Sequence, residues 1–360
     1  MRIALLGASN SLMKPGYVPE LVRLLERRGG SVRLDNLSLG AATVFHGIGL
    51  CDRMEPDAYD LVLVESAVTD APMINRRSIG LWRAAADALL ARLRAAQPRA
   101  RIVVAFLGAD LESFHAHVAS MRRGWVALCA AHGTEFEDVA GYVEALIGQA
   151  PPARAAAWSD PAHYARPVTT ALVAHRLMLR LDGPARPPDW PDAAEGADAP
   201  WGGPDLRAAR RIDAPGLAAR ADEAPPLVRF ANAAFDVEAI EIGEDRPLTL
   251  DLPGALIVLT TVSRNDSGIL WIERDGAAPV GVPTRSSLHA TQGRDFVLRP
   301  HFPLRGLKRD RGGPVRLSVR RLGDVPRPAL ALEPGLPPEE GPPGPLRVRI
   351  ADALVAPPRG

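Results

Sequence analysis

Residues 2–12 read RIALLGASNSL, a short apolar run that leads into a glycine, an alanine and a serine. Residues 2–7 have the composition of a buried strand, and residues 18–30 continue with a helical apolar face that stops at Gly29-Gly30. This stretch therefore predicts a strand, a turn and a helix. In open parallel sheets, ligands bind beyond the carboxyl ends of the strands. Ser9 lies at such a position, and is the first candidate for a functional residue.

The same alternation of short apolar runs and helical patterns continues through the first half of the chain. Further strands are expected at 31–37, 60–66, 101–108 and 135–139, and further helices at 76–97, 110–132 and 161–181. Alternating strands and helices indicate a parallel sheet that is covered on both faces. The predicted fold class for residues 1–182 is therefore α/β, a flavodoxin-like three-layer domain with a parallel five-stranded sheet.

The pattern changes after this domain. Residues 183–226 are rich in Pro, Ala, Gly and Asp without periodicity, which predicts a linker. From residue 227 to 356 apolar residues recur at every second position, with turn signals at NDSG (265–268) and RDG (274–276). Alternating sets are Leu248, Leu250, Leu252; Val315, Leu317, Val319; and Leu346, Val348, Ile350. This part is predicted to be an all-β sandwich-like accessory domain.

Bulk composition excludes several classes of function. The chain has 360 residues, a formal net charge of +1 and a pI near 7.9, so no charge excess favours nucleic acid or a membrane surface. Cys51 and Cys129 are the two cysteines, which argues against a disulfide scaffold or a zinc site. No apolar run approaches the roughly 20 residues that span a bilayer, and no signal peptide is recognised, so a cytoplasmic location is expected.

A serine nucleophile needs a base within hydrogen-bond reach and a group that orients the base. Asp160 and His163 supply these residue types, three positions apart in SDPAHY. The alternative is that Asp160 caps a helix whose first residue is Pro161, with His163 exposed in its first turn. A nucleotide-binding turn at residues 7–11 is a further alternative, although the spacing of neither phosphate-binding glycine motif is present.

Other polar elements fall at the ends of the predicted strands. Gly40 ends the second strand in NLSLGAAT, where its backbone N–H could point into a crevice, and Thr69 and Asp70 follow the third strand in VESAVTDA. Each also has a plain structural interpretation, because Gly40 suits a turn and Thr69 or Asp70 suits a helix cap.

Taken in order, these segments resemble the SGNH (GDSL-type) hydrolases over about residues 1–182. The blocks that match are Gly7-Ala8-Ser9-Asn10-Ser11, Gly40, Val68-Thr69-Asp70 and Asp160-Pro161-Ala162-His163. Two positions depart from the family pattern, because Ala8 stands where an aspartate is usual and Thr69 where an asparagine is usual.

The resemblance implies Ser9 as nucleophile, His163 as general base and Asp160 as the residue that orients the base. It also implies oxyanion donors from the backbone N–H groups of Ser9 and Gly40 and from the side chain of Thr69. A threonine hydroxyl is shorter than an amide, so the departure at position 69 bears directly on this oxyanion hole.

Weaker candidates complete the set. Asn10, Asp70 and Tyr164 are possible substrate-binding residues, and Trp271, Phe296 and Phe302 could stack on sugars, although core packing is the commoner use of such rings. No histidines show metal-ligand spacing, so neither a metal nor a cofactor is expected.

The leading functional hypothesis is a serine esterase that acts on an acylated carbohydrate or a small ester, O-acetyl esters included. The alternatives are an O-acyltransferase on a glycan that uses the same triad, and a non-catalytic binding protein that retains the crevice. The expected partner is a small-molecule or glycan ester, with no role for nucleic acid or membrane.

Overall fold

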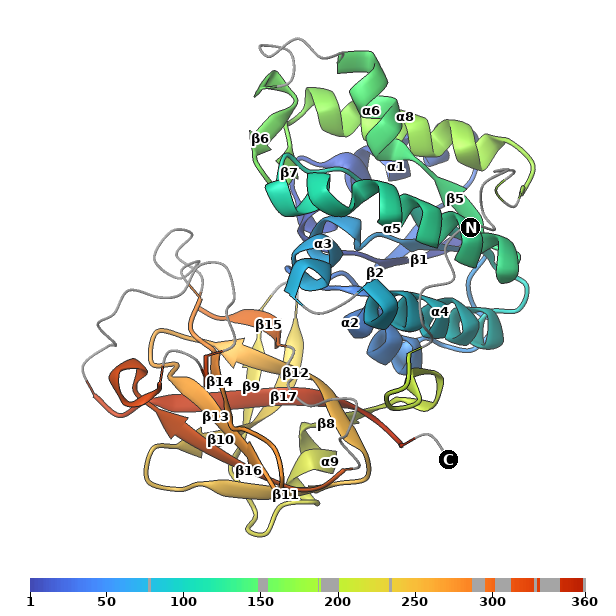
Figure 1. The fold of residues 1–360 in the computed structure, drawn as a ribbon. Helices are drawn as coiled ribbons and strands as arrows, with labels where there is room; N and C mark the ends of the chain where they lie inside the picture. The colour runs from blue at the N-terminus through green and yellow to red at the C-terminus, as the bar shows by residue number, and fades with distance from the viewer. Residues whose placement is uncertain are drawn as a thin grey trace. The chain divides into compact units, whose positions relative to one another are not determined.

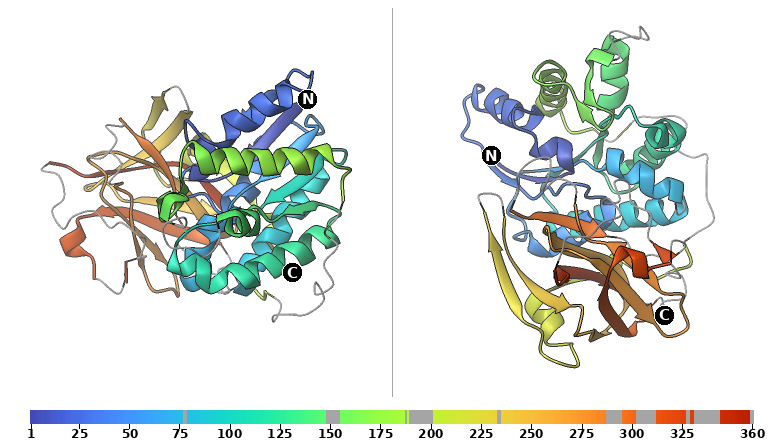
Figure 2. Two further views of the ribbon diagram at one scale, coloured as in Figure 1. Left: turned by 90° about the horizontal axis from the view of Figure 1, so that it is seen from above. Right: turned by 90° about the vertical axis from the view of Figure 1, so that its left-hand side faces the viewer.

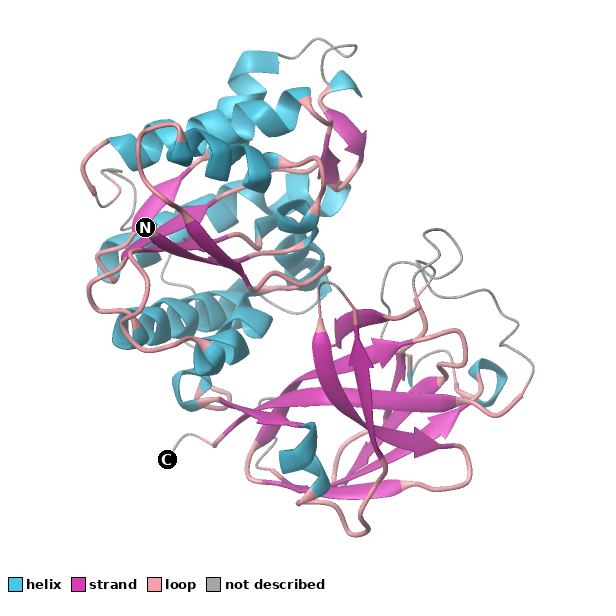
Figure 3. Cartoon of the chain, turned by 180° about the vertical axis from the view of Figure 1, so that it is seen from behind, coloured by secondary structure: helices cyan, strands magenta, loops and turns pink. Residues whose placement is uncertain are grey.

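The structure is a computed structural model that describes residues 1–76, 79–147, 155–186, 188, 201–232, 235–286, 295–301, 312–326, 329–330 and 344–358. The chain divides into two compact units, Met1–Trp201 and Gly202–Gly360. Helices surround a sheet in the first unit, and strands dominate the second (Figure 3).

The first unit is built on a sheet of five parallel strands in the order β2-β1-β3-β4-β5. The strands are β1 (Arg2–Leu6), β2 (Arg33–Asn36), β3 (Leu61–Val64), β4 (Arg101–Ala105) and β5 (Glu135–Glu137). The central strands are almost wholly apolar because helices cover both of their faces. Strand order reverses at β1, so the turn that follows β1 lies at the position where such sheets bind ligands.

Seven helices of the described residues flank this sheet (Figure 1). They are α1 (Tyr17–Glu26), α2 (Val44–Leu50), α3 (Ala67–Arg76), α4 (Ile79–Ala96), α5 (Glu112–Ala131), α6 (Val139–Ile147) and α8 (Val168–Asp182), with a 3-10 turn η2 at Cys51–Arg53. Helices α1 and α8 lie side by side (Figure 2) and α6 packs on α8, whereas α2 to α5 pack on one another. The predicted three-layer α/β class is confirmed.

The sequence prediction lacks two short helices of the first unit. The predicted helix at 76–97 corresponds to α4, and two further short helices, α2 and α3, precede it. Glycines interrupt the helical pattern of α2 and Pro72 that of α3, so their local signals are weak.

The second unit contains two antiparallel sheets. One sheet has the order β15-β12-β17-β10-β9 with β8 also paired to β17, and the other has the order β11-β16-β13-β14. The first consists of β8 (Arg210–Asp213), β9 (Leu227–Ala231), β10 (Asp236–Gly243), β12 (Ala255–Ser263), β15 (Val297–His301) and β17 (Arg347–Ala356). The second consists of β11 (Leu248–Leu252), β13 (Ile269–Arg274), β14 (Val280–Pro283) and β16 (Gly313–Arg320).

The alternating apolar residues of these strands form one buried core between the sheets. Leu248 pairs with Leu317 and Leu250 with Val315 across β11 and β16, and both pairs face Val348 and its neighbours in the same cluster. The predicted β-sandwich-like domain is therefore confirmed as a fold class.

Part of the segment that the sequence analysis assigned to the linker is ordered in this unit. The 3-10 turn η3 (Leu206–Ala208) and strand β8 precede the short helix α9 (Ala214–Ala218), whose Ala214 and Leu217 belong to the sandwich core. Asp213 caps α9 by accepting the N–H of Gly216 at 3.0 Å. These elements are too short for periodicity to reveal them, and the pairing of β8 with β17 is what places them.

The aromatic residues of this unit that were considered for sugar stacking pack inside it. Trp271 and Phe296 are both buried, Trp271 beneath the guanidinium of Arg320 and Phe296 against Phe230. Phe302 lies outside the described residues. Neither of the two described rings has a free face to offer a sugar.

Within the described part of the chain, no helix is both long enough and apolar enough to cross a bilayer.

Candidate active site

Ser9 opens a short 3-10 turn, η1 (Ser9–Leu12), directly after β1. The N–H of Ser11 closes this turn onto the carbonyl of Ala8 at 3.2 Å. The turn is tight because residue 7 has no side chain: a Cβ there would come within 2.2 Å of the Ser11 Oγ and 2.9 Å of the Ser38 Oγ. Gly7 thus permits the close approach of the backbone that presents Ser9 at the carboxyl edge of the sheet.

The segment that contains His163 is a hairpin, and the predicted helix start at Pro161 is wrong. Strands β6 (Trp158–Asp160) and β7 (His163–Tyr164) pair antiparallel, with Asp160 opposite His163. The Asp160 carboxylate accepts the N–H of Ala162 at 2.9 Å, which forms a local turn. Helix α8 starts only after Pro167, because a proline at that position would interrupt a helix that began six residues earlier.

The hairpin brings the three predicted residues together. His163 Nε2 lies 2.8 Å from Ser9 Oγ, and His163 Nδ1 lies 2.8 Å from both carboxylate oxygens of Asp160. The His163 side chain is 20% exposed and that of Asp160 is 48% exposed. The chain of contacts runs from hydroxyl to imidazole to carboxylate, and it is open to solvent on the Asp160 side.

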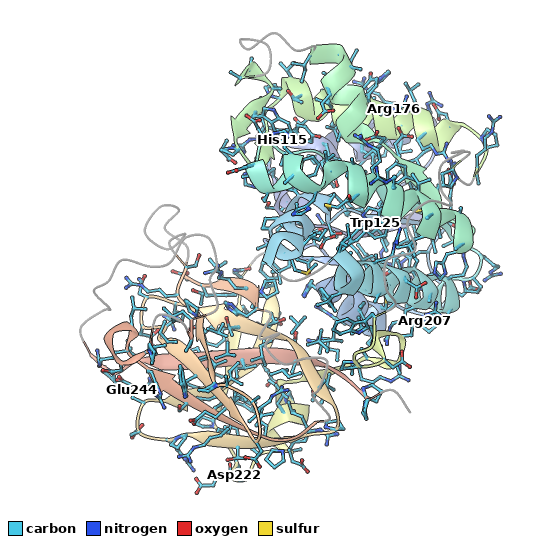
Figure 4. All side chains as sticks on the ribbon, in the orientation of Figure 1. His115, Trp125, Arg176, Arg207, Asp222 and Glu244 are labelled. Carbon is cyan, nitrogen blue, oxygen red and sulfur yellow. The ribbon has the colours of Figure 1, made fainter. Side chains whose placement is uncertain are left out.

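Two contacts hold the tip of the hairpin against the rest of the unit. Asn10, next to the serine, donates from Nδ2 to the carbonyl of Ala162 at 3.1 Å, and the N–H of Asp110 donates to the carbonyl of Pro161 at 2.7 Å. The Asp110 carboxylate also lies 3.1 Å from Nε2 of His115, a residue that Figure 4 labels near the start of α5. Asn10 was a weak substrate-binding candidate; it is buried, and its amide ties the nucleophile turn to the base.

Tyr164 has an internal role and does not face a substrate, contrary to the sequence prediction. It is buried, its ring stacks on Trp158 with centroids 4.6 Å apart, and its hydroxyl accepts the N–H of Gly108 at 2.7 Å. Burial raises the pKa of its phenol, so it stays neutral. The side chain therefore anchors β7 to the loop after β4.

Backbone donors for an oxyanion are present at two of the predicted positions. Gly40 lies in a turn in which the N–H of Ala42 donates to the carbonyl of Leu39 at 3.0 Å. The N–H of Leu39 donates to the carbonyl of Gly7 at 3.1 Å, which ties this turn to the end of β1. Among the hydrogen bonds of the described residues, none uses the backbone N–H of Gly40 or of Ser9. Both groups remain able to donate to a ligand.

The side chain of Thr69 is engaged elsewhere. Its Oγ1 contacts the carbonyl of Ala42 and lies 2.9 Å from the carbonyl of Ser66. A hydroxyl carries one hydrogen and both neighbours are acceptors, so that hydrogen is used within the protein. The geometry therefore gives Thr69 no free donor for an oxyanion, in contrast to the role that the resemblance implies.

Asp70 is wholly buried and does not reach the site surface, so it is not a substrate-binding residue. It accepts hydrogen bonds from the Val44 N–H at 3.0 Å, the Ser66 hydroxyl at 2.8 Å and the Trp82 indole at 3.1 Å. Burial nevertheless raises its pKa to about 7. Asp70 ties α2, α3 and α4 together beneath the site.

One residue of the site was not named among the sequence candidates. Glu65 follows β3, is 1% exposed, and accepts the Ala8 N–H and the Ser11 hydroxyl, each at 3.0 Å. The signal for it was an acidic residue at the end of an otherwise apolar strand.

No group of three His, Cys, Asp or Glu side chains that could hold a metal ion occurs within the residues that the structure describes.

Known proteins match this chain in structure and not in sequence. No protein-family model matches the sequence, and no curated protein does. Among solved structures, a two-domain esterase active on acetylated mannans, co-crystallized with mannopentaose, matches 99% of this chain and 91% of its own with a TM-score of 0.60 at 13% identity. The chain shares its fold with this two-domain esterase.

Two further solved structures each match about half of this chain. They are an acetylxylan esterase from Geobacillus stearothermophilus, solved as a catalytic mutant (16% identity, 51% of this chain and 94% of that chain, TM-score 0.41), and a protein from Parabacteroides merdae described as a GDSL-like lipase (19% identity, 49% and 94%, TM-score 0.42). The fold that the resemblance implies is shared with the two-domain esterase.

Proposed function

We propose that this chain is a serine esterase that removes acyl groups, acetyl groups in particular, from acylated carbohydrates. The observation that carries the proposal is the contact between Ser9 Oγ and His163 Nε2 at 2.8 Å, with Asp160 at 2.8 Å on the other ring nitrogen. Three residues from opposite ends of the unit meet in the order that nucleophilic acyl transfer requires.

The reaction follows from this arrangement. Ser9 Oγ attacks the acyl carbon while its proton passes to His163 Nε2, and Asp160 stabilises the imidazolium that forms. The ester C–O bond then breaks, the leaving alcohol takes the proton from His163, and the acyl group stays on Ser9. Water repeats the sequence: it gives a proton to His163, attacks the acyl carbon and releases the carboxylic acid as the proton returns to Ser9.

The oxyanion that develops in each half-reaction would be held by the N–H groups of Ser9 and Gly40. Since the Thr69 hydroxyl already donates to a backbone carbonyl, the hole has two donors in this geometry. Loss of one donor lowers the rate of another serine hydrolase by roughly 10²–10³. We therefore expect a slower esterase than one with a full set of donors.

Two observations support a carbohydrate ester as substrate. The two-domain esterase that shares the fold over both units is active on acetylated mannans. In this chain, the half-exposed Asp160 and partly exposed His163 leave the triad open to a bulky alcohol such as a sugar. Small acyl groups on a large leaving group suit such an open site.

The test is covalent labelling by a fluorophosphonate, in which Ser9 Oγ displaces fluoride from phosphorus, together with acetate release from acetylated manno-oligosaccharides and from 4-nitrophenyl acetate. The wild type is expected to react in all three assays and Ser9→Ala in none. Ser120→Ala, at a partly exposed position on α5, is the matched control and is expected to retain full activity. A wild type that folds but is not labelled would contradict the proposal.

A second candidate, a non-catalytic glycan-binding protein, is favoured by the engagement of Thr69. It requires that Ser9→Ala binds an acetylated oligosaccharide as tightly as the wild type while the wild type releases no acetate. Isothermal titration with both proteins distinguishes the two candidates.

A further inference from the structure

Glu65 lies where the nucleophile strand and its neighbour end together. Its N–H donates to the carbonyl of Leu6 at 2.8 Å, so the pairing of β1 and β3 continues one residue beyond β3. The side chain is thereby directed under the turn that contains Ser9, and almost none of it is exposed.

The Glu65 carboxylate holds this turn from both sides of the serine. Its Oε2 accepts the backbone N–H of Ala8 and the hydroxyl of Ser11, each at 3.0 Å. Because the Ser11 hydrogen is used in this way, the Tyr17 hydroxyl must donate to Ser11 Oγ across 2.7 Å. A chain from Tyr17 through Ser11 to Glu65 thus links α1 to the nucleophile turn.

Glu65 also interacts electrostatically with the base. The other oxygen, Oε1, is buried and has no hydrogen-bond partner among the described residues. Burial raises the pKa of Glu65 above its usual value, and the two donors and the electrostatic attraction of His163 offset only part of that rise. The titratable groups that interact with this carboxylate are Tyr17 on α1, Asp70 on α3, and His163 and Tyr164 on β7.

We propose that Glu65 is a positioning residue for the Ser9 reaction, whose carboxyl group fixes the nucleophile turn and, in its ionised form, favours the protonated imidazole of His163. The inference rests on the proposed esterase function. In the acyl-transfer step His163 gains a proton, and an anion nearby lowers the energy of that state relative to the neutral ring. A carboxamide would keep an acceptor for the turn but would lack this charge.

The test compares Glu65→Gln with the wild type in fluorophosphonate labelling and in the pH profile of kcat/KM for 4-nitrophenyl acetate. We expect kcat to fall by about tenfold to 10²-fold, the range of a small misplacement of reacting groups, with KM nearly unchanged. The acid limb of the profile is expected to move to lower pH, because the imidazolium loses a stabilising anion. A purely structural role would not move that limb.

The matched control is Glu135→Gln. Glu135 is a buried carboxylate on β5 of the same sheet, where it pairs with Arg101 and Arg180 and not with the nucleophile turn. This variant is expected to lose stability but to keep the wild-type kcat and pH profile.

A second variant keeps the inference testable if Glu65→Gln does not fold. Ser11→Ala removes one contact to the carboxylate but keeps the charge, so kcat should fall while the acid limb stays in place. If Ser11→Ala shifts the acid limb, or if folded Glu65→Gln has the wild-type kcat and profile, Glu65 has no such role. A wild type that is not labelled at all overturns the esterase proposal, and this inference with it.

Discussion

Thr69 is the residue at which resemblance and geometry differ most. Its hydroxyl lies between the carbonyls of Ala42 and Ser66, and its one hydrogen is used there. The side chain therefore links α3 to the segment that follows Gly40 and leaves no hydrogen for a substrate. For most residues of the site, the chemical type of the side chain is enough to predict its role. At Thr69 the neighbouring acceptors decide it.

Thr69→Val should therefore change stability more than catalysis. We expect kcat to stay within about threefold of the wild type, far from the roughly 10²–10³-fold loss that removal of an oxyanion donor causes. The lost hydrogen bond should lower the free energy of unfolding by about 1 kcal/mol. Steady-state kinetics and urea unfolding measure the two effects.

Thr170→Val is the matched control for this substitution. Thr170 on α8 likewise donates to a carbonyl three residues earlier, that of Pro167, at 2.9 Å. It should show a similar loss of stability and no kinetic effect. A fall in kcat of a hundredfold in Thr69→Val alone would show that the hydroxyl turns toward the oxyanion during the reaction.

The buried carboxyl of Asp70 makes stability depend on pH. Burial raises its pKa from 3.8 to about 7, so between these values the folded protein holds a proton that the unfolded chain has released. The free energy of unfolding must then fall as pH rises through this window, by on the order of 4 kcal/mol. Above it both states are ionised and the loss is complete.

Asp70→Asn removes this titration. Urea unfolding between about pH 4 and pH 7 should show that the wild type loses stability relative to Asp70→Asn as pH rises. Glu65 is buried too, and its titration also changes the stability of the wild type with pH. Because Asp70→Asn keeps Glu65, the difference between the two proteins isolates the effect of Asp70. Parallel stability curves for the two proteins would mean that Asp70 is ionised throughout this range.

Among the elements, α5 shows how closely the helices of the first unit pack. Trp125 on α5, labelled in Figure 4, meets Trp82 on α4 edge to face with ring centroids 5.6 Å apart. Gly124 lets this contact form, because a Cβ there would lie 2.6 Å from the Trp82 ring. The Trp82 indole in turn donates to the Asp70 carboxylate beneath the site, so the packing of α5 on α4 helps to hold Asp70 in place.

Gly124→Ala should destabilise the unit even though alanine favours helices. Overpacking typically costs about 1–3 kcal/mol, which exceeds a gain in helix propensity of up to about 1 kcal/mol. Thermal unfolding should show a lower Tm. Gly30→Ala, where nothing lies within 4 Å of the added Cβ, is expected to leave the Tm unchanged. An unchanged Tm for Gly124→Ala would mean that Trp82 can move aside without loss.

The whole molecule contains two compact units, and the β-sandwich has a buried core formed by its own residues. Leu63 lies in the sheet of the first unit and Leu317 in the sandwich core, and both are buried. Since all three triad residues belong to the first unit, the chemistry should follow the stability of that unit.

Leucine-to-alanine substitutions in each core test this separation. Each should cost about 2–5 kcal/mol in its own unit. Leu317→Ala should lower the temperature of one calorimetric transition and leave Ser9 labelling at 25 °C unchanged, whereas Leu63→Ala should reduce the temperature up to which Ser9 is labelled. Loss of labelling at 25 °C in folded Leu317→Ala would show that the sandwich supports the reaction directly.

The sequence was sufficient to predict the elements whose signals are local. Period-two and helical patterns extend over many residues in the strands and helices of both units, because the buried faces of these elements repeat along the chain. The same holds for the order of the SGNH blocks, since residues that follow successive parallel strands must meet at one edge of the sheet. That Asp160 and His163 join Ser9 was implied by the resemblance, because these two residues do not follow a predicted parallel strand.

Tertiary contacts settled the remaining features, because these depend on partners far away in the chain. The hairpin at residues 158–164 forms where a helix was expected, since Tyr164 reaches Gly108 and the turn is held by Asn10 and Asp110. The burial of Asp70 and the contacts of Glu65 likewise depend on residues 12 to 57 positions distant. A hydrogen-bond partner is chosen by proximity in space, and no local pattern records that choice.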